Sequence, residues 1–154
     1  MKLLTLVSTV IVLTSILACA AAAGDAPAPL AVTNRALGGG PLNQYTPGVY
    51  GGTGLNNIGL LIRTWGRVTY VDTVNKWFYI DDGAGRTDGT KRTDGTTILG
   101  IRVSYDNLAP GNNINPPTQG VYVLVTGIST TIIGSDGNIY PNVRPRRDTD
   151  VVSL

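Results

Sequence analysis

The stretch from Gly59 to Asp82 limits the fold most strongly, because it carries two β-strand patterns joined by a short polar turn at 73–76. Side chains alternate between the two faces of a strand, so the first strand has one face suited to a core and one that is cationic and aromatic. The core-type face holds Ile62, Thr64, Gly66, Val68 and Tyr70. The opposite face holds Arg63, Trp65, Arg67 and Thr69.

The second strand of this pair repeats the arrangement. Phe78 and Ile80 are in phase with a core, whereas Trp77 and Tyr79 face away from it. Both tryptophans of the chain are therefore predicted on a face that the core does not need. We expect the later strands to add to this pair.

Three later segments also have strand patterns, each bounded by turn residues. They span residues 97–106, 121–129 and 139–147. The segment 121–129 is apolar on both sides, which predicts that both of its faces are covered. Before it, the proline-rich stretch 107–120 allows one helical turn but no longer helix.

The last predicted strand, 139–147, contains two prolines, Pro141 and Pro145. Proline has no N–H for a sheet ladder, so these residues favour a position at the edge of the sheet. Alternation places Val143 on the inner side. The outward side holds Asn142, Arg144 and Arg146.

Composition supports a single domain with many turns. The chain has 154 residues, 20 glycines and 9 prolines, and shows no long amphipathic helical pattern. Basic residues exceed acidic ones by 12 to 10, and Lys2 belongs to a segment that we expect to be removed. The mature chain then has a net charge close to zero, so a large basic field does not indicate a partner.

Residues 1–23 have the pattern of a signal peptide. A charged start is followed by an apolar run to Leu17 and by small residues at the predicted cut, near Ala20 or Ala23. This predicts a secreted protein, extracellular or at the cell surface, with no membrane span after cleavage. Cys19 leaves an alternative open, because the residues before it loosely match a lipoprotein signal in which this cysteine carries the lipid anchor.

Residues 24–57 are rich in glycine and proline and are predicted to be a linker or an N-terminal extension, followed by the folded domain at 58–154. Glycine-rich runs can bind phosphate, but that use requires a helix start after the loop, and here a strand follows. Scattered apolar residues could still lie against the outside of the domain. They are Leu37, Leu42, Tyr45, Val49 and Tyr50.

Between the second and third strands the pentapeptide Arg-Thr-Asp-Gly-Thr occurs twice, at 86–90 and 92–96. Each Asp-Gly signals a tight turn, so the duplication is interpreted as an elongated loop tip. A calcium loop is the alternative, although the spacing fits no EF-hand and no glutamate closes it. Its ligands would be Asp81, Asp82, Asp88 and Asp94.

These strand motifs together resemble the OB-fold, in its nucleic-acid-binding, tRNA-anticodon-binding-like form. The matching pieces are I-x-x-W-G-R-V, F-Y-I-D-D-G, G-I-R-V and V-x-V-x-G, over about residues 58–151. The resemblance implies a five-stranded Greek-key barrel, with the helix common between strands three and four replaced by the proline-rich loop. The segment 54–66 also resembles exported bacterial proteins, which implies no activity by itself.

The sequence predicts a protein that is not an enzyme. The chain has no histidine, and Asp81 and Asp82 are neighbours in a strand whose side chains point in opposite directions. Ser104 and Ser129 have no histidine to activate them, and Cys19 is removed with the signal peptide. We also expect no cofactor and no bound metal.

The first functional hypothesis is a secreted binding module for single-stranded nucleic acid, in which aromatic rings stack on bases and arginines contact phosphates. The candidate ligand-binding residues are Arg63, Trp65, Arg67, Trp77, Tyr79, Arg102, Arg144 and Arg146. The alternative is a structural or adhesive protein of the cell surface or extracellular matrix, a subunit of an assembly that binds protein or glycan. A third interpretation is purely structural: the arginine stems cover the aromatic rings, or the N-terminal segment covers the face.

Overall fold

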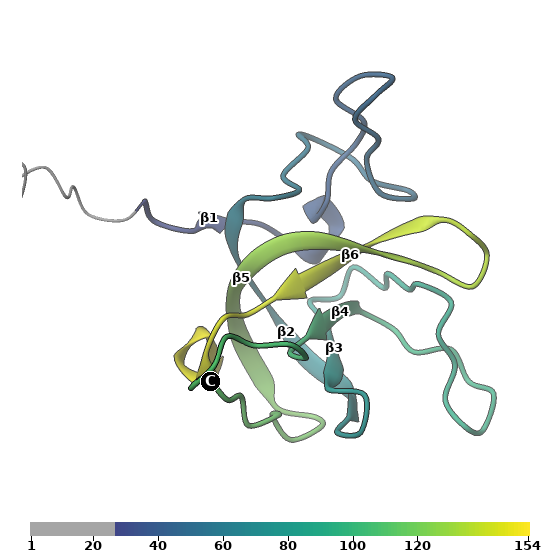
Figure 1. Cartoon of the computed structure of the whole chain (residues 1–154). Helices are drawn as coiled ribbons and strands as arrows, with labels where there is room; N and C mark the ends of the chain where they lie inside the picture. Colours follow the sequence, from purple (N-terminus) through teal and green to yellow (C-terminus); the bar gives the residue numbers. More distant parts are fainter. Residues whose placement is uncertain (1–26) are drawn as a thin grey trace, which may run out of the picture.

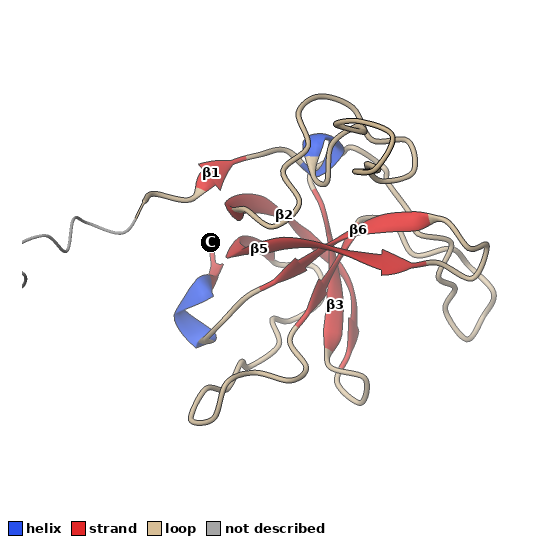
Figure 2. Ribbon diagram, turned by 45° about the horizontal axis from the view of Figure 1, so that its top comes forward, coloured by secondary structure: helices blue, strands red, loops and turns tan. Residues whose placement is uncertain are grey.

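The computed structural model describes residues 27–154, which form an all-β structure built around a closed five-stranded barrel (Figures 1 and 2). The predicted signal peptide and Cys19 lie outside the described residues. Among residues 27–154, no helix has the length and apolar character needed to cross a membrane.

The barrel strands follow one another in the order β2-β3-β4-β6-β5, and pairing of β5 with β2 closes the ring. All neighbours are antiparallel except β4 and β6, which run parallel. This confirms the predicted all-β five-stranded barrel and is compatible with an OB-fold. The strands are β2 (Leu61–Asp72), β3 (Trp77–Asp81), β4 (Ile101–Ser104), β5 (Tyr122–Ile133) and β6 (Ile139–Arg144).

Two short strands extend the barrel wall. β1 (Leu30–Ala31) pairs in parallel with β2, and β7 (Val151–Ser153) pairs antiparallel with β5. A single 3₁₀ turn, η1 (Asn34–Ala36), follows β1, and another, η2 (Asp148–Asp150), precedes β7. Neither short strand is predicted from the sequence, because two or three residues are too few to show an alternating pattern.

Alternation along β2 is as predicted from Ile62 to Val68. The inward residues of this stretch are buried, and the outward ones are exposed. They pack into a core that uses all five barrel strands. The fully or nearly fully buried core residues include Ile62, Val68, Phe78, Ile80, Ile101, Val103, Val123, Val125 and Val143.

The predicted inward position of Tyr70 is wrong, because β2 contains a β-bulge. Val68 pairs with Ile80 and Tyr70 pairs with Tyr79, so Thr69 is an extra residue with no partner of its own. An extra residue reverses the alternation that follows it. Tyr70 therefore lies on the outer side, and Val71 packs against the core instead.

The predicted edge position of the last strand is also wrong. β6 lies between β4 and β5, and Pro141 lies within it opposite Thr131 of β5, just before the residues that pair with β4. Asn142 lies on the outer side, as predicted, where it pairs with Arg102 of β4, but it is buried there. Its amide oxygen accepts a hydrogen bond from the Ser104 hydroxyl (2.9 Å), and its amide nitrogen donates to the Thr130 hydroxyl (3.0 Å).

Residues 107–120 contain no helix, as predicted. Ile114 from this loop is buried in the core, and Leu108 packs against it. The loop thus supplies apolar side chains at one end of the barrel.

The glycine-rich segment 34–57, which we call the cap, packs against the other end of the barrel (Figure 1). Leu37 enters the core, and Asn57 replaces missing backbone partners by accepting from the N–H of Gly38 (2.9 Å) and donating to the carbonyl of Ala36 (2.7 Å). Gly39 has φ +67°, and a Cβ there would collide with the backbone of Leu55. Glycine therefore allows the cap to fold closely on itself.

Candidate binding surface

The eight candidate ligand-binding residues do not share one surface but divide into three groups. The first is on β2, the second on the outer side of β3 and β4, and the third at the end of β6. The groups are Arg63, Trp65 and Arg67; Trp77, Tyr79 and Arg102; and Arg144 and Arg146.

The β2 group is exposed. Trp65 keeps 45% of its surface accessible and lies between Arg63 and Arg67 on the same face of the strand. Each arginine is held by one Nε–H, from Arg63 to the Thr126 hydroxyl and from Arg67 to the Gly120 carbonyl, both at 3.1 Å. No carboxylate of the described residues forms an ion pair with either guanidinium group.

Tyr122 on β5 joins this group, although the sequence pattern did not indicate it. It pairs with Arg67 across the β2–β5 ladder, and half of its surface is exposed. The prediction that both faces of this strand are covered is wrong at this position. We call Arg63, Trp65, Arg67 and Tyr122 the β2–β5 platform.

The second group is covered by the chain itself. Tyr79 is on the outer side of β3, as predicted, but is completely buried beneath the loop 82–100. Its hydroxyl donates to the Asp88 carboxylate (2.5 Å) and accepts from the Nε–H of Arg102 (2.9 Å). Burial, reinforced by the hydrogen bond to Asp88, raises the pKa of the Tyr79 phenol well above its usual range. Arg102 also forms an ion pair with Asp88 at 3.2 Å.

Trp77 is half-buried within a stack of rings and guanidinium groups. Its ring centroid lies 5.5 Å from that of Tyr70 and 5.4 Å from that of Tyr79. The Arg102 guanidinium carbon is 4.9 Å from the Trp77 centroid, and that of Arg92 is 5.2 Å from the Tyr70 centroid. These contacts stabilise the wall of the barrel, so this group fits the purely structural interpretation of the arginine and aromatic residues.

The third group is neutralised by neighbouring acids. Arg144 forms an ion pair with Asp106 at 3.0 Å and donates to its backbone carbonyl at 2.6 Å. Arg146 forms an ion pair with Asp150 at 2.9 Å, and its hydrogen bond to that carboxylate raises the pKa of the Arg146 guanidinium. These two arginines are therefore less suited to an added phosphate than the β2 group.

The two copies of the repeated pentapeptide have the same local structure but different surroundings. In each, the aspartate accepts the N–H of the threonine two residues later at 2.9 Å, in Asp88 to Thr90 and in Asp94 to Thr96. Asp88 of the first copy is buried, whereas Asp94 of the second is exposed. The predicted loop tip is thus correct only for the second copy.

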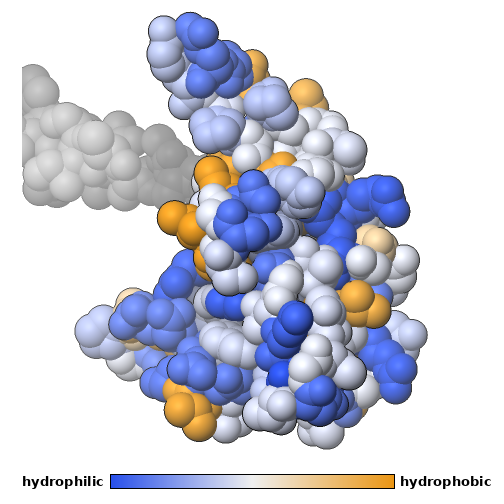
Figure 3. Space-filling model, turned by 90° about the vertical axis from the view of Figure 1, so that its right-hand side faces the viewer, coloured by the Kyte–Doolittle hydropathy of each residue, from blue (hydrophilic) through white to orange (hydrophobic). Residues whose placement is uncertain are grey.

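The first copy also connects the loop to the cap. The Arg86 guanidinium donates to the carbonyls of Tyr50 (2.7 Å), Gly51 (3.2 Å) and Arg35 (3.3 Å). Figure 3 views the molecule from the side on which the loop 82–100 and the β5–β6 hairpin project, and this side is mostly blue and white with separate orange spots. The covering loop thus gives this side of the barrel a mainly polar surface.

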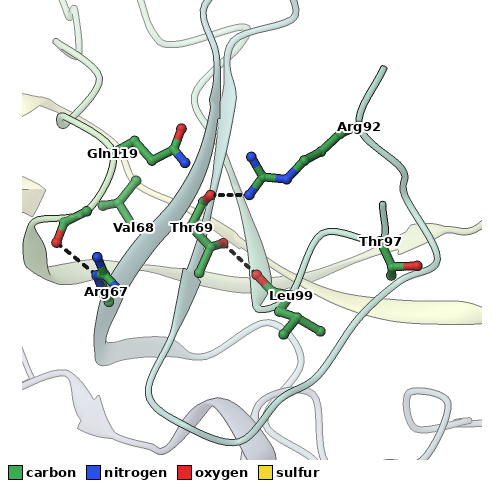
Figure 4. A pocket seen from close by; sticks show the side chains of 8 residues that line it. Arg67, Val68, Thr69, Arg92, Thr97, Leu99 and Gln119 are labelled. Atoms are coloured by element: carbon green, nitrogen blue, oxygen red, sulfur yellow. Dashed lines mark hydrogen bonds between the residues drawn. The ribbon is translucent and has the colours of Figure 1, made fainter. Parts of the chain in front are cut away.

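A pocket of about 300 Å³ lies between β2 and the loop 82–100 (Figure 4). Two arginines reach it from different elements, Arg67 from β2 and Arg92 from the start of the second pentapeptide copy. Arg92 donates to the Thr69 carbonyl at 2.7 Å, at the β-bulge. The remaining lining residues are Val68, Thr69, Thr97, Leu99, Gln119 and Gly120.

The four aspartates of the calcium alternative are not brought together. Across residues 27–154, no three Asp, Glu, His or Cys side chains form a group that could hold a metal ion. Asp88 pairs with Arg102, and Asp81 and Asp82 accept backbone N–H groups of their own turn, from Gly85 (3.0 Å) and Ala84 (3.1 Å). The carboxylates therefore have structural roles in turns and in one ion pair.

The chain matches no protein-family model and no curated protein sequence.

Proposed function

We propose that this protein is an exported, non-catalytic binding module that holds single-stranded nucleic acid on its β2–β5 platform. The observation that carries the proposal is Trp65, an exposed ring between two guanidinium groups that no described carboxylate neutralises. Sequence-tolerant binding of single strands combines these two elements, rings that stack on bases and cations that contact phosphates.

The spacing of the platform supports this use. Residues two apart on one face of a strand are about 6.6 Å apart, so Arg63 and Arg67 lie on either side of the Trp65 ring along β2. Tyr122 supplies a second ring on the neighbouring strand. Stacking contributes about 1–3 kcal/mol per base, so two rings can give measurable affinity without a large basic field.

The outer side of β3 and β4 is a poorer candidate, even though OB-folds commonly bind ligands on that side. The loop 82–100 already occupies it, Tyr79 is completely buried there, and Arg102 is held by Asp88. Binding on this side would require the loop to release an ion pair and several hydrogen bonds. The proposal therefore moves the binding surface to the neighbouring strand.

A fluorescent oligo-dT titrated at several salt concentrations tests the proposal. Trp65→Ala should weaken binding by about 1–3 kcal/mol, the contribution of one stacked base. Arg63→Gln should reduce the dependence of log affinity on log salt by about 0.7, the value for one phosphate contact on a single strand. Tyr45→Ala is the matched control, because it removes an exposed aromatic ring from the cap, away from the platform. Absence of binding at low salt, or equal affinities for Trp65→Ala and Tyr45→Ala, would refute the proposal.

A second candidate function, a structural or adhesive subunit, is favoured by the cap. Residues 36–62 include no charged side chain, and several of their large apolar residues are exposed, three of them over more than two-thirds of their surface. Their exposed fractions are 69% for Leu42, 84% for Tyr45 and 89% for Leu55. Contiguous exposed apolar surface marks contacts with other macromolecules, and this second candidate assigns such a surface to the cap.

Sedimentation over a range of protein concentrations distinguishes this candidate. Assembly through the cap should appear as concentration-dependent association that the double variant Leu42→Ser, Tyr45→Ser abolishes. A monomer at every concentration would count against self-assembly and would leave the nucleic-acid proposal unaffected.

A further inference from the structure

The pocket between β2 and the loop 82–100 is built around two guanidinium groups with fixed positions. Arg67 donates from Nε to the Gly120 carbonyl (3.1 Å), and Arg92 donates from one terminal nitrogen to the Thr69 carbonyl (2.7 Å). In Figure 4 the two groups lie on opposite sides of Thr69. Each arginine uses one N–H donor of its guanidinium group to hold its position, and the remaining N–H donors are available for another acceptor.

The backbone around the pocket is also fixed. The Thr69 hydroxyl donates to the Leu99 carbonyl (2.5 Å), which ties the loop to the β-bulge. The Arg92 guanidinium rests on the Tyr70 ring. A ligand would therefore meet two cations that are already ordered, which reduces the entropic cost of binding.

The charge inside the pocket is positive. Within residues 27–154 the lining contains two arginines and no acid. Two acids lie close to the pocket arginines: Asp81 pairs with Arg67 across the β2–β3 ladder and accepts the Gly85 N–H, and Asp94 accepts the N–H and hydroxyl of Thr96 and attracts Arg92. Neither forms an ion pair with an arginine of the pocket.

We infer that this pocket is a phosphate-binding site, in which the guanidinium groups of Arg67 and Arg92 hold one phosphate group from two sides. Guanidinium forks match the oxygens of phosphate, and Thr97 and Gln119 add a hydroxyl and an amide at the rim. Arg67 belongs to both the pocket and the β2–β5 platform. If the phosphate belongs to a bound nucleic-acid strand, the inference rests on the proposed function and deepens it. The same pocket would also bind a free phosphate.

Two probes separate these sources. In the first arm, inorganic phosphate is added to the isotope-labelled full chain while the arginine Nε–H signals are followed by NMR. The signals of Arg67 and Arg92 should shift, whereas that of Arg63, which lies outside the pocket, should not. In the second arm, oligo-dT binding is compared between Arg92→Gln and Lys91→Gln, a matched control that removes a charge from the adjacent exposed residue.

If a strand phosphate enters the pocket, Arg92→Gln should weaken oligo-dT binding about tenfold or more, the effect of one charge-assisted hydrogen bond, and should lower the salt slope by about 0.7. Lys91→Gln should change affinity by less than about twofold, as expected for an exposed charge without a direct contact. Because Arg92 also stacks on Tyr70, Arg67→Gln repeats the test from the opposite wall without disturbing that contact.

Either arm can support the inference. Shifts of Arg67 and Arg92 with inorganic phosphate, but no specific effect of Arg92→Gln on oligo-dT, would identify a free phosphate as the ligand. The inference is overturned if phosphate shifts neither signal and Arg92→Gln behaves like Lys91→Gln. The inference is also overturned if Arg92→Gln weakens the binding of heparin but affects neither phosphate probe, because the site would then belong to an acidic glycan. Failure of the proposed function can be told apart from failure of this inference. If the β2–β5 platform does not bind nucleic acid, Trp65→Ala will not weaken oligo-dT binding, whereas the shifts that inorganic phosphate causes will be unaffected.

Discussion

The duplicated pentapeptide allows the same substitution to be made in two places that differ only in their surroundings. Asp88→Asn in the first copy should destabilise the protein, whereas Asp94→Asn in the second should leave the melting temperature unchanged. Asp88 is buried and holds both Tyr79 and Arg102, while Asp94 is exposed and holds only its own turn.

The size of the effect follows from the contacts of each carboxylate oxygen. In Asp88, Oδ1 accepts the Thr90 N–H, which asparagine can still do. Oδ2 accepts from both the Tyr79 hydroxyl and Arg102, and an amide NH₂ at that position would face the donors of Arg102. Hydrogen bonds to charged groups contribute about 1.5–3 kcal/mol, and the Arg102 side chain is 21% exposed, so we expect a loss of about 2–3 kcal/mol.

Thermal and urea unfolding followed by circular dichroism measure this difference. For a domain of this size, about 2–3 kcal/mol corresponds to a fall of roughly 10 °C in melting temperature. Equal effects of the two variants would show that the first copy does not hold the loop on the barrel. A large effect of Asp94→Asn alone would reverse the assignment of the two copies.

Two further predictions concern the core and the buried phenol. Val68→Asp should prevent folding, because it places an unpaired charge inside the barrel, and circular dichroism should show a far larger loss of stability than for Arg67→Asp on the opposite face. Since the pKa of Tyr79 is raised in the folded state, the unfolded chain loses this proton first, and stability should fall by about 1.4 kcal/mol per pH unit above pH 10 through this group. Tyr79→Phe should make the pH dependence of unfolding between pH 10 and 11 shallower by about 1 kcal/mol per pH unit, because the unfolded phenol is still partly protonated there. An unchanged slope would contradict a protonated, buried Tyr79.

Local patterns predicted the barrel because its strands bury one face and the side-chain period of two is visible in β2 and β3. The same rule failed after Val68, since a bulge is one extra residue and leaves no clear mark in the alternation. The inner position of β6 was also missed, because proline alone indicates an edge, while the pairing partners of a strand depend on the whole ring.

The candidate site was predicted only in part, for a physical reason. Alternation correctly placed Trp65 and Tyr79 on the outer side, but exposure depends on what else packs there. A loop from the next connection covers Tyr79, and the sequence contains no local signal of that long-range contact. The sequence does not indicate Arg92 as a binding residue for the same reason, since it reaches the pocket from a loop that the sequence predicts to project into solvent.

The cap contacts sites that are made much later in the chain, and this sets an order of folding. Asn34 donates to the Ile80 carbonyl, Tyr50 donates from its backbone to Ile139, and Arg86 reaches back to Tyr50. Contacts between residues distant in sequence form late because a long loop must close first. The cap should therefore gain protection from hydrogen exchange only after β6 has joined the barrel, and should be the first part to lose it when the native protein opens locally.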